Sequence, residues 1–217
     1  MPSEFAALYD AEWDRQRRRA DLIDSHLPVH RWYLRHGTPW TVDDVAPPRA
    51  DLKIMRGVEP SIQFYRFLYH TVGQDYLWGD RRRMDDATLL SLVQNDSVHV
   101  MVLYQNGVPA GFYELVFDYE GATELAYFGL LPGFTGGGLG SYLLTSALTH
   151  AGRARVPLNV NTCSLDHRSA LENYMRRGFY VVREDDELYP DPRLDGTIPA
   201  HAAAHIPSVA SLLDKTP

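Results

Sequence analysis

Five glycines within the eight residues Gly133 to Gly140 are the clearest indication of a ligand site in this chain. An apolar run, Leu125 to Leu131, precedes them, and apolar residues recur at helical spacing from Leu139 to Ala151. This order predicts a strand, a tight glycine loop and a helix. The first N–H groups of a helix have no partner within it, and glycines let a ligand approach the backbone closely. The stretch therefore predicts a phosphate-binding turn.

Two common phosphate-binding motifs do not fit this loop. A P-loop requires a lysine and a Ser or Thr after its last glycine, whereas Gly138 is followed by Leu139. A dinucleotide-binding G-x-G-x-x-G lacks its third glycine, because the count meets Ser141 from Gly136 and Leu143 from Gly138. Binding of some other nucleotide phosphate stays open.

A second motif follows the predicted helix. Residues 174–179, Tyr-Met-Arg-Arg-Gly-Phe, resemble a Leu-Tyr-x-x-x-Gly-Phe ending, and residues 135–140 resemble a Gln/Arg-x-x-Gly-x-Gly/Ala cradle. Together, in this order, they resemble the GNAT superfamily of acyl-CoA-dependent N-acetyltransferases, over Asp51 to Glu187. One position departs from the family pattern. Thr135 stands where Gln or Arg is usual, which shortens a side chain that would bond near the pyrophosphate.

The resemblance implies acetyl-CoA as cosubstrate and no metal. The strand before the loop would pair with pantetheine amides, and N–H groups of the loop and first helical turn would bind the pyrophosphate. His167 lies where the family often has an Asn that contacts CoA, and it could donate to the cofactor or cap the next helix. The implied cofactor-binding residues are Phe128, Gly129, Leu130, Leu131, Thr135, Gly136, Gly137, Gly138, Leu139, Gly140, Ser141, His167 and Tyr174.

Two residues are candidates for proton transfer. Tyr174 matches the family's general acid, since a phenol with a pKa near ~10 can protonate a thiolate whose conjugate acid lies near ~8.5. The alternative is a core tyrosine on a helix face. Glu124, at the start of the central strand, resembles the carboxylate that some members use as a base, and Glu114 is its rival. Each could also be an exposed carboxylate at a strand end.

The reaction that the resemblance implies is transfer of an acetyl group from acetyl-CoA to a primary amine. The amine would attack directly in a ternary complex, so no covalent intermediate and no role for Cys163 are expected. The alternative is a catalytically inactive CoA-binding module with a regulatory or structural role.

The acceptor site in this resemblance is walled by the first two helices and their connection. Tyr65 and Trp78 are the candidate substrate-binding residues, with Asp80 nearby. Rings and carboxylates suit a cation, so we expect a small-molecule amine rather than a protein acceptor. The alternative is that Tyr65 belongs to the core and that Trp78 packs on the N-terminal segment.

Local signals place these residues in an α/β (α+β) fold. They predict the order strand, two helices, three strands, helix, strand, helix, strand, with Asn106-Gly107 as a hairpin turn and Asp166 as cap of the last helix. The resemblance implies a GNAT-like mixed sheet, in which an antiparallel meander joins a parallel strand pair that splays at the CoA site, flanked by helices. We expect an N-terminal extension (1–50) that packs on the main domain (51–187), and a C-terminal tail (188–217).

Composition excludes several other classes. The net charge is −7, which argues against a general nucleic-acid binder. The sequence has no apolar run long enough for a transmembrane helix and no signal-peptide pattern, so we expect no membrane partner. A single cysteine, Cys163, cannot form an internal disulfide. We therefore expect a cytoplasmic protein.

Overall fold

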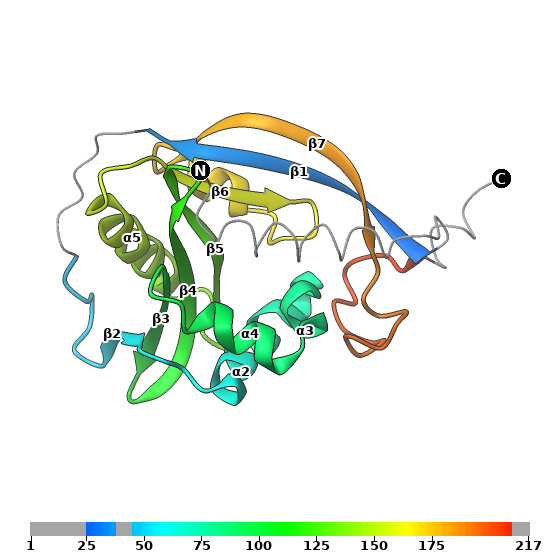
Figure 1. The fold of residues 1–217 in the computed structure, drawn as a ribbon, viewed down its shortest axis with the longest axis horizontal. Coiled ribbons are helices and arrows are strands. Elements are labelled where there is room, and N and C mark those ends of the chain that lie inside the picture. Colours follow the sequence, from blue (N-terminus) through cyan, green and yellow to red (C-terminus); the bar gives the residue numbers. More distant parts are fainter. Residues whose placement is uncertain (1–24, 38–44, 210–217) are drawn as a thin grey trace.

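A computed structural model describes residues 25–37 and 45–209 of the 217-residue chain (Figure 1). Within these residues, seven strands form one mixed sheet in the order β2-β3-β4-β5-β6-β1-β7. The strands are β1 (His26–His36), β2 (Leu52–Gly57), β3 (Val98–Gln105), β4 (Val108–Tyr119), β5 (Ala122–Leu130), β6 (Leu158–Cys163) and β7 (Tyr180–Pro190). The helices are α2 (Ile62–Gly73), α3 (Asp80–Arg83), α4 (Asp86–Val93), α5 (Leu139–Gly152) and α6 (Ala170–Met175). Within these ranges, no helix is both long enough and apolar enough to cross a membrane.

Helices cover both faces of the sheet, because successive strand residues point to opposite sides. Phe112 and Tyr113 are neighbours on β4, yet Phe112 packs in the core built with α2 and α4, and Tyr113 in the core built with α5. Figure 1 accordingly shows α5 on the other side of the sheet from α2 and α4. Asp85 is the N-cap of α4, and its carboxylate accepts a hydrogen bond from the Thr88 N–H (2.9 Å).

The strands β3, β4 and β5 form the expected antiparallel meander. Asn106 and Gly107 join β3 to β4 with φ values of 51° and 78°. Both lie in the left-handed region, as a two-residue type I′ hairpin requires, which explains the preference for Asn-Gly at this turn. The predicted hairpin is confirmed.

The parallel strands β5 and β6 are neighbours only at their beginnings. The described register joins them from Thr123, opposite Leu158, to Leu125, opposite Val160, and contains no further pair. Beyond Leu125, β5 continues along β4 while β6 pairs with β1. The mixed sheet with a splayed parallel pair, flanked by helices, is therefore confirmed.

The strand β1 lies inside the sheet, although it belongs to the segment that we expected to be an N-terminal extension. It pairs antiparallel with β6, where Arg31 faces Cys163, and with β7, where His26 faces Pro190. It thus separates β6 from β7 (Figure 1). Residues 1–24 and 38–44 lie outside the described part of the chain, so the other contacts expected of the extension stay predictions.

The described part of the expected C-terminal tail is packed against the sheet. Ile198 is 0% exposed and joins a cluster with Leu27 and Val29 of β1. Arg193 closes the turn that follows β7, because it donates to the Asp191 carboxylate (2.8 Å) and to the Ile206 carbonyl (2.9 Å). This segment therefore belongs to the folded body.

Candidate active site

A cavity of about 390 Å³ lies where β5 and β6 part. Its walls come from residues 125–130 of β5, from β6, from the glycine loop with the start of α5, and from α6. The expected cofactor-binding residues that line it are Phe128, Gly129, Leu130, Thr135, Gly136, Gly140, Ser141, His167 and Tyr174. The fold thus brings the glycine loop and the Tyr174 motif, which are far apart in sequence, to one cavity.

The other expected cofactor-binding residues do not line the cavity. Leu131 and Leu139 are 5% and 4% exposed and belong to the two cores. The Leu131 N–H donates to the Ala110 carbonyl (2.9 Å), so this N–H is not free for pantetheine. A Cβ at Gly137 or Gly138 would meet nothing within 4 Å, which places these glycines beside open space.

The glycine loop has the geometry of a phosphate cradle. Gly136 and Gly138 have φ values of 85° and 77°, in the left-handed region that L side chains rarely adopt. Gly138 is the N-cap of α5 and offers no side chain to the first N–H groups of that helix. Open space therefore meets the positive end of the α5 dipole, and this arrangement fits the pyrophosphate of a CoA.

Tyr174 combines a packing role with a place in the cavity wall. It is 7% exposed, and its ring meets Phe179 edge-on with centroids 5.5 Å apart. Burial raises the pKa of the Tyr174 phenol, and the charges of Asp166 and Glu124 raise it further. The phenol therefore keeps its proton across the physiological range and is available as a donor.

Glu124 lies on β5 opposite Asn159 of β6, one residue before the pairing of the two strands ends. It is half-buried and is not itself part of the cavity wall, but Leu125 beside it and Asn161, which bonds to its side chain, both are. Burial raises the pKa of the Glu124 carboxyl to about 8, although the Asn161 hydrogen bond opposes the shift. Such a carboxylate is a far stronger base than an exposed glutamate.

Glu114, the rival base, is held in a buried ion pair. It is 0% exposed and accepts hydrogen bonds from the Arg81 guanidinium (2.7 Å) and the Tyr65 hydroxyl (2.6 Å). Tyr65 is also 0% exposed, so it lies in the core beside Glu114 and outside the cavity wall. The expectation that Tyr65 binds substrate does not match this placement, whereas Trp78 does line the cavity.

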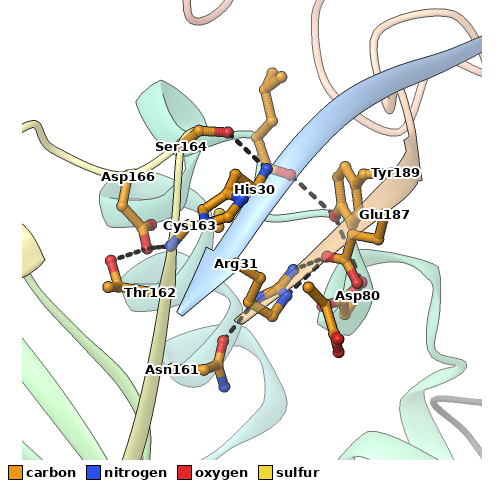
Figure 2. A network of polar contacts seen from close by, with 12 residues as sticks. His30, Arg31, Asp80, Asn161, Thr162, Cys163, Ser164, Asp166, Glu187 and Tyr189 are labelled. Carbon is orange, nitrogen blue, oxygen red and sulfur yellow. Dashed lines mark hydrogen bonds and ion pairs between the residues drawn. The ribbon is translucent and has the colours of Figure 1, made fainter. Parts of the chain in front are cut away.

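Sequence reasoning missed a polar network around Arg31 and Tyr189, which both line the cavity (Figure 2). The Arg31 guanidinium of β1 donates to Glu187 of β7 (2.7 Å) and to Asn161 of β6 (2.6 Å). The Tyr189 hydroxyl donates to the Leu77 carbonyl (3.1 Å), with Asp80 as a weaker second acceptor (3.4 Å). A usable signal was the charged Arg31 at the same strand parity as the apolar Leu27 and Val29.

Asp166 has a different role from the predicted helix cap. It accepts hydrogen bonds from the Thr162 hydroxyl (2.8 Å) and the Cys163 N–H (3.0 Å) (Figure 2). The Trp78 side chain also forms a hydrogen bond with Asp166. The helix α6 begins later, with Ser169 as its N-cap. Asp166 therefore fixes Trp78 in the cavity wall.

His167 forms hydrogen bonds with Ser169 at the beginning of α6 and also lines the cavity. Its Nδ1 lies 2.7 Å from the Ser169 hydroxyl and accepts a longer hydrogen bond (3.3 Å) from the Ser169 N–H. Both roles expected of this residue, next to the cofactor and next to a helix end, are therefore compatible with its position.

Solved structures of other proteins share the fold of this chain. A GCN5-related N-acetyltransferase from Sphaerobacter thermophilus matches with a TM-score of 0.56 and 16% identity, over 75% of this chain and 51% of that one. One from Kribbella flavida matches with a TM-score of 0.53 and 17% identity, over 79% and 63%. The chain thus spans about half to two thirds of these structures. A search of curated proteins found no match.

A family model settles the relationship at the level of sequence. The model for the acetyltransferase (GNAT) family matches residues 55–179, which include β3 to β6, the glycine loop and the Tyr174 motif. This is more than half of the chain. The protein belongs to the acetyltransferase (GNAT) family.

Proposed function

We propose that the protein transfers an acetyl group from acetyl-CoA to a primary amine of a small molecule. The observation that carries this proposal is that one cavity is lined by the glycine cradle, the splayed part of β5 and Tyr174. A phosphate site, an extended backbone for the pantetheine arm and a buried proton donor are the parts that such a reaction needs.

The side chains divide the proton transfers between them. Acetyl-CoA supplies an activated acetyl thioester when bound. Glu124 takes a proton from the acceptor ammonium, directly or through water, so that the nitrogen has a free electron pair. As the C–N bond forms and the C–S bond breaks, Tyr174 donates its proton to the sulfur. The nitrogen loses its second proton as the amide forms, and this proton returns to the Tyr174 phenolate through water. No covalent enzyme intermediate is needed.

We call the part of the cavity around Trp78 the acceptor end, and rings and carboxylates line it. The Trp78 ring centroid lies 5.1 Å from that of Tyr127 and 6.3 Å from that of Tyr76. Asp80 and Asp166 line the same region. Aromatic faces attract cations and carboxylates pair with ammonium groups, which supports a cationic acceptor.

The burial of Asp80 supports the same acceptor class. Three arginines lie near its carboxyl, and each also has a carboxylate partner of its own: Arg31 with Glu187, Arg81 with Glu114, and Arg83 with Asp195. Burial raises the pKa of Asp80, which shows that its charge is poorly solvated, and a bound ammonium would offset that cost.

Binding and turnover test the proposal separately. Calorimetry should detect acetyl-CoA binding, and ATP or NAD should not compete with it. Thiol release should then occur with amines in a panel of polyamines, amino acids, aminoglycosides and peptides. Absence of acetyl-CoA binding at millimolar concentration would end the proposal. Tight binding without thiol release for any amine would instead support a catalytically inactive CoA-binding module.

A further inference from the structure

The side chain of Arg177 reaches the glycine cradle from a different element. Arg177 follows α6, and its guanidinium donates a hydrogen bond to the Ser141 hydroxyl in the first turn of α5 (2.7 Å). A second bond, to the Asn173 carbonyl (3.2 Å), fixes the other arm of the guanidinium. Arg177, Ser141 and Thr135 all line the same cavity.

No described residue neutralises the charge of Arg177. Both of its hydrogen-bond partners are neutral, and among the described residues no carboxylate lies within ion-pair distance of it. Its neighbour Arg176 differs, because it is exposed and pairs with Glu172 on the surface of α6. Arg177 also lies beside the N-terminus of α5, where the helix dipole disfavours a cation. An anion between the two would remove this conflict.

We infer that Arg177 binds the pyrophosphate of the CoA cosubstrate and supplies the long polar side chain that Thr135 lacks. A guanidinium suits this role, since its N–H groups can bond two phosphate oxygens at once. The threonine at position 135 is too short to reach out from the loop in this way. The cradle is thus completed by the residue before Gly178 rather than by the loop itself.

This inference rests on the proposed use of acetyl-CoA, and a ladder of shortened cosubstrates tests it by binding alone. Arg177→Gln should weaken acetyl-CoA binding about 10- to 100-fold, as expected for loss of a charge-assisted hydrogen bond. The loss should be equal for acetyl-dephospho-CoA, which keeps the pyrophosphate. It should vanish for S-acetylpantetheine, which has none. Calorimetry or competition binding gives all three values without turnover.

Matched variants separate charge from packing. Arg176→Gln removes the adjacent, surface-paired arginine and should leave all three affinities unchanged. Arg177→Lys keeps the positive charge but lacks the planar guanidinium that can bond two oxygens at once. Its affinity for acetyl-CoA should therefore lie between those of the wild type and Arg177→Gln. Ser141→Ala removes the neutral partner of Arg177 and should cost less than Arg177→Gln.

The possible outcomes are distinguishable. If the wild-type protein does not bind acetyl-CoA, the proposed function fails. If it binds and Arg177→Gln binds equally well, the inference about Arg177 is wrong. A loss seen with acetyl-CoA but not with acetyl-dephospho-CoA would assign Arg177 to the 3′-phosphate and overturn the pyrophosphate assignment. An equal loss with S-acetylpantetheine would show a structural role only.

Discussion

Burial raises the pKa of both Tyr174 and Glu124, and the same shift suits them to opposite tasks. A phenol with a raised pKa holds its proton until a thiolate appears. Tyr174→Phe removes this proton but keeps the ring that packs against Phe179. We expect kcat to fall about 10²-fold or more, with the acetyl-CoA Kd nearly unchanged. Thiol-release kinetics and calorimetry measure the two quantities. A fall of less than about threefold would mean that water protonates the thiolate.

For Glu124 the raised pKa predicts a pH profile. A general base acts when deprotonated, so with a carboxyl pKa of about 8 in the free protein the kcat/KM should rise with pH up to about 8 and level off above it. Glu124→Gln should lower kcat and remove this limb. The acceptor amine also titrates, so the profile is measured with two acceptors of different pKa. A limb that moves with the acceptor would contradict the assignment to Glu124.

Asp80 gives a prediction for the acceptor that leaves the cosubstrate untouched. Asp80→Asn keeps the shape of the side chain but removes the charge, so the KM of a cationic acceptor should rise about 10- to 100-fold. The acetyl-CoA Kd should stay the same. Asp75→Asn is the matched control, because Asp75 is exposed and outside the cavity wall. Equal KM values for Asp80→Asn and the wild type would exclude Asp80 as an acceptor anchor.

The roles of these residues could be predicted from the sequence to different extents. The glycine loop and the Tyr174 motif are local patterns, so their chemistry is visible without a structure. The burial and contacts of Tyr65 and Glu114 do not follow from a local pattern. The hydrogen bonds that Glu114 accepts from Tyr65 and Arg81 depend on α2, α3 and β4 lying next to one another, and no pattern within a single segment predicts this.

At the scale of elements, the glycine loop and α5 act together. Gly138 has a φ of 77°, so any replacement is strained, but Asn tolerates the left-handed region best. Gly138→Asn and Gly138→Asp have nearly the same shape and differ in charge. We expect Gly138→Asp to bind acetyl-CoA at least tenfold more weakly than Gly138→Asn, since a carboxylate would repel the pyrophosphate. Calorimetry compares the two, and equal affinities would place the phosphates elsewhere.

The elements were predicted best where their signals are local. The Asn106-Gly107 hairpin follows from turn chemistry, and the parallel pairing of β5 with β6 follows from the crossover through α5. The splay of the two strands was expected from the GNAT resemblance and not from a local signal. The strand β1 was not foreseen in the sheet. Its partners, β6 and β7, lie more than a hundred residues later in the chain, so the alternation at Leu27, Val29 and Arg31 could indicate a strand but not the strands with which it pairs.

At the scale of the whole molecule, three apolar clusters hold the cavity in place. Two lie on the two faces of the central sheet. The third joins β1, Leu77 and the segment after β7, and it backs the acceptor end of the cavity through Tyr189 and Leu165. Arg83 ties the same segment to α3 by its ion pair with Asp195 (3.1 Å). The acceptor wall is thus built from both ends of the described chain.

This arrangement predicts that the segment after β7 unfolds together with the sheet. Ile198 is 0% exposed, and Ile198→Ala should lower the free energy of unfolding by about 2–5 kcal/mol through lost burial and the cavity left behind. Leu194→Ala, at a position that is 55% exposed in the same segment, should change it by less than about 0.5 kcal/mol. Urea denaturation followed by circular dichroism and by tryptophan fluorescence measures both variants. Coincident single transitions, shifted only by Ile198→Ala, are the expected result. A separate early transition, or no shift for Ile198→Ala, would show that this segment does not support the fold.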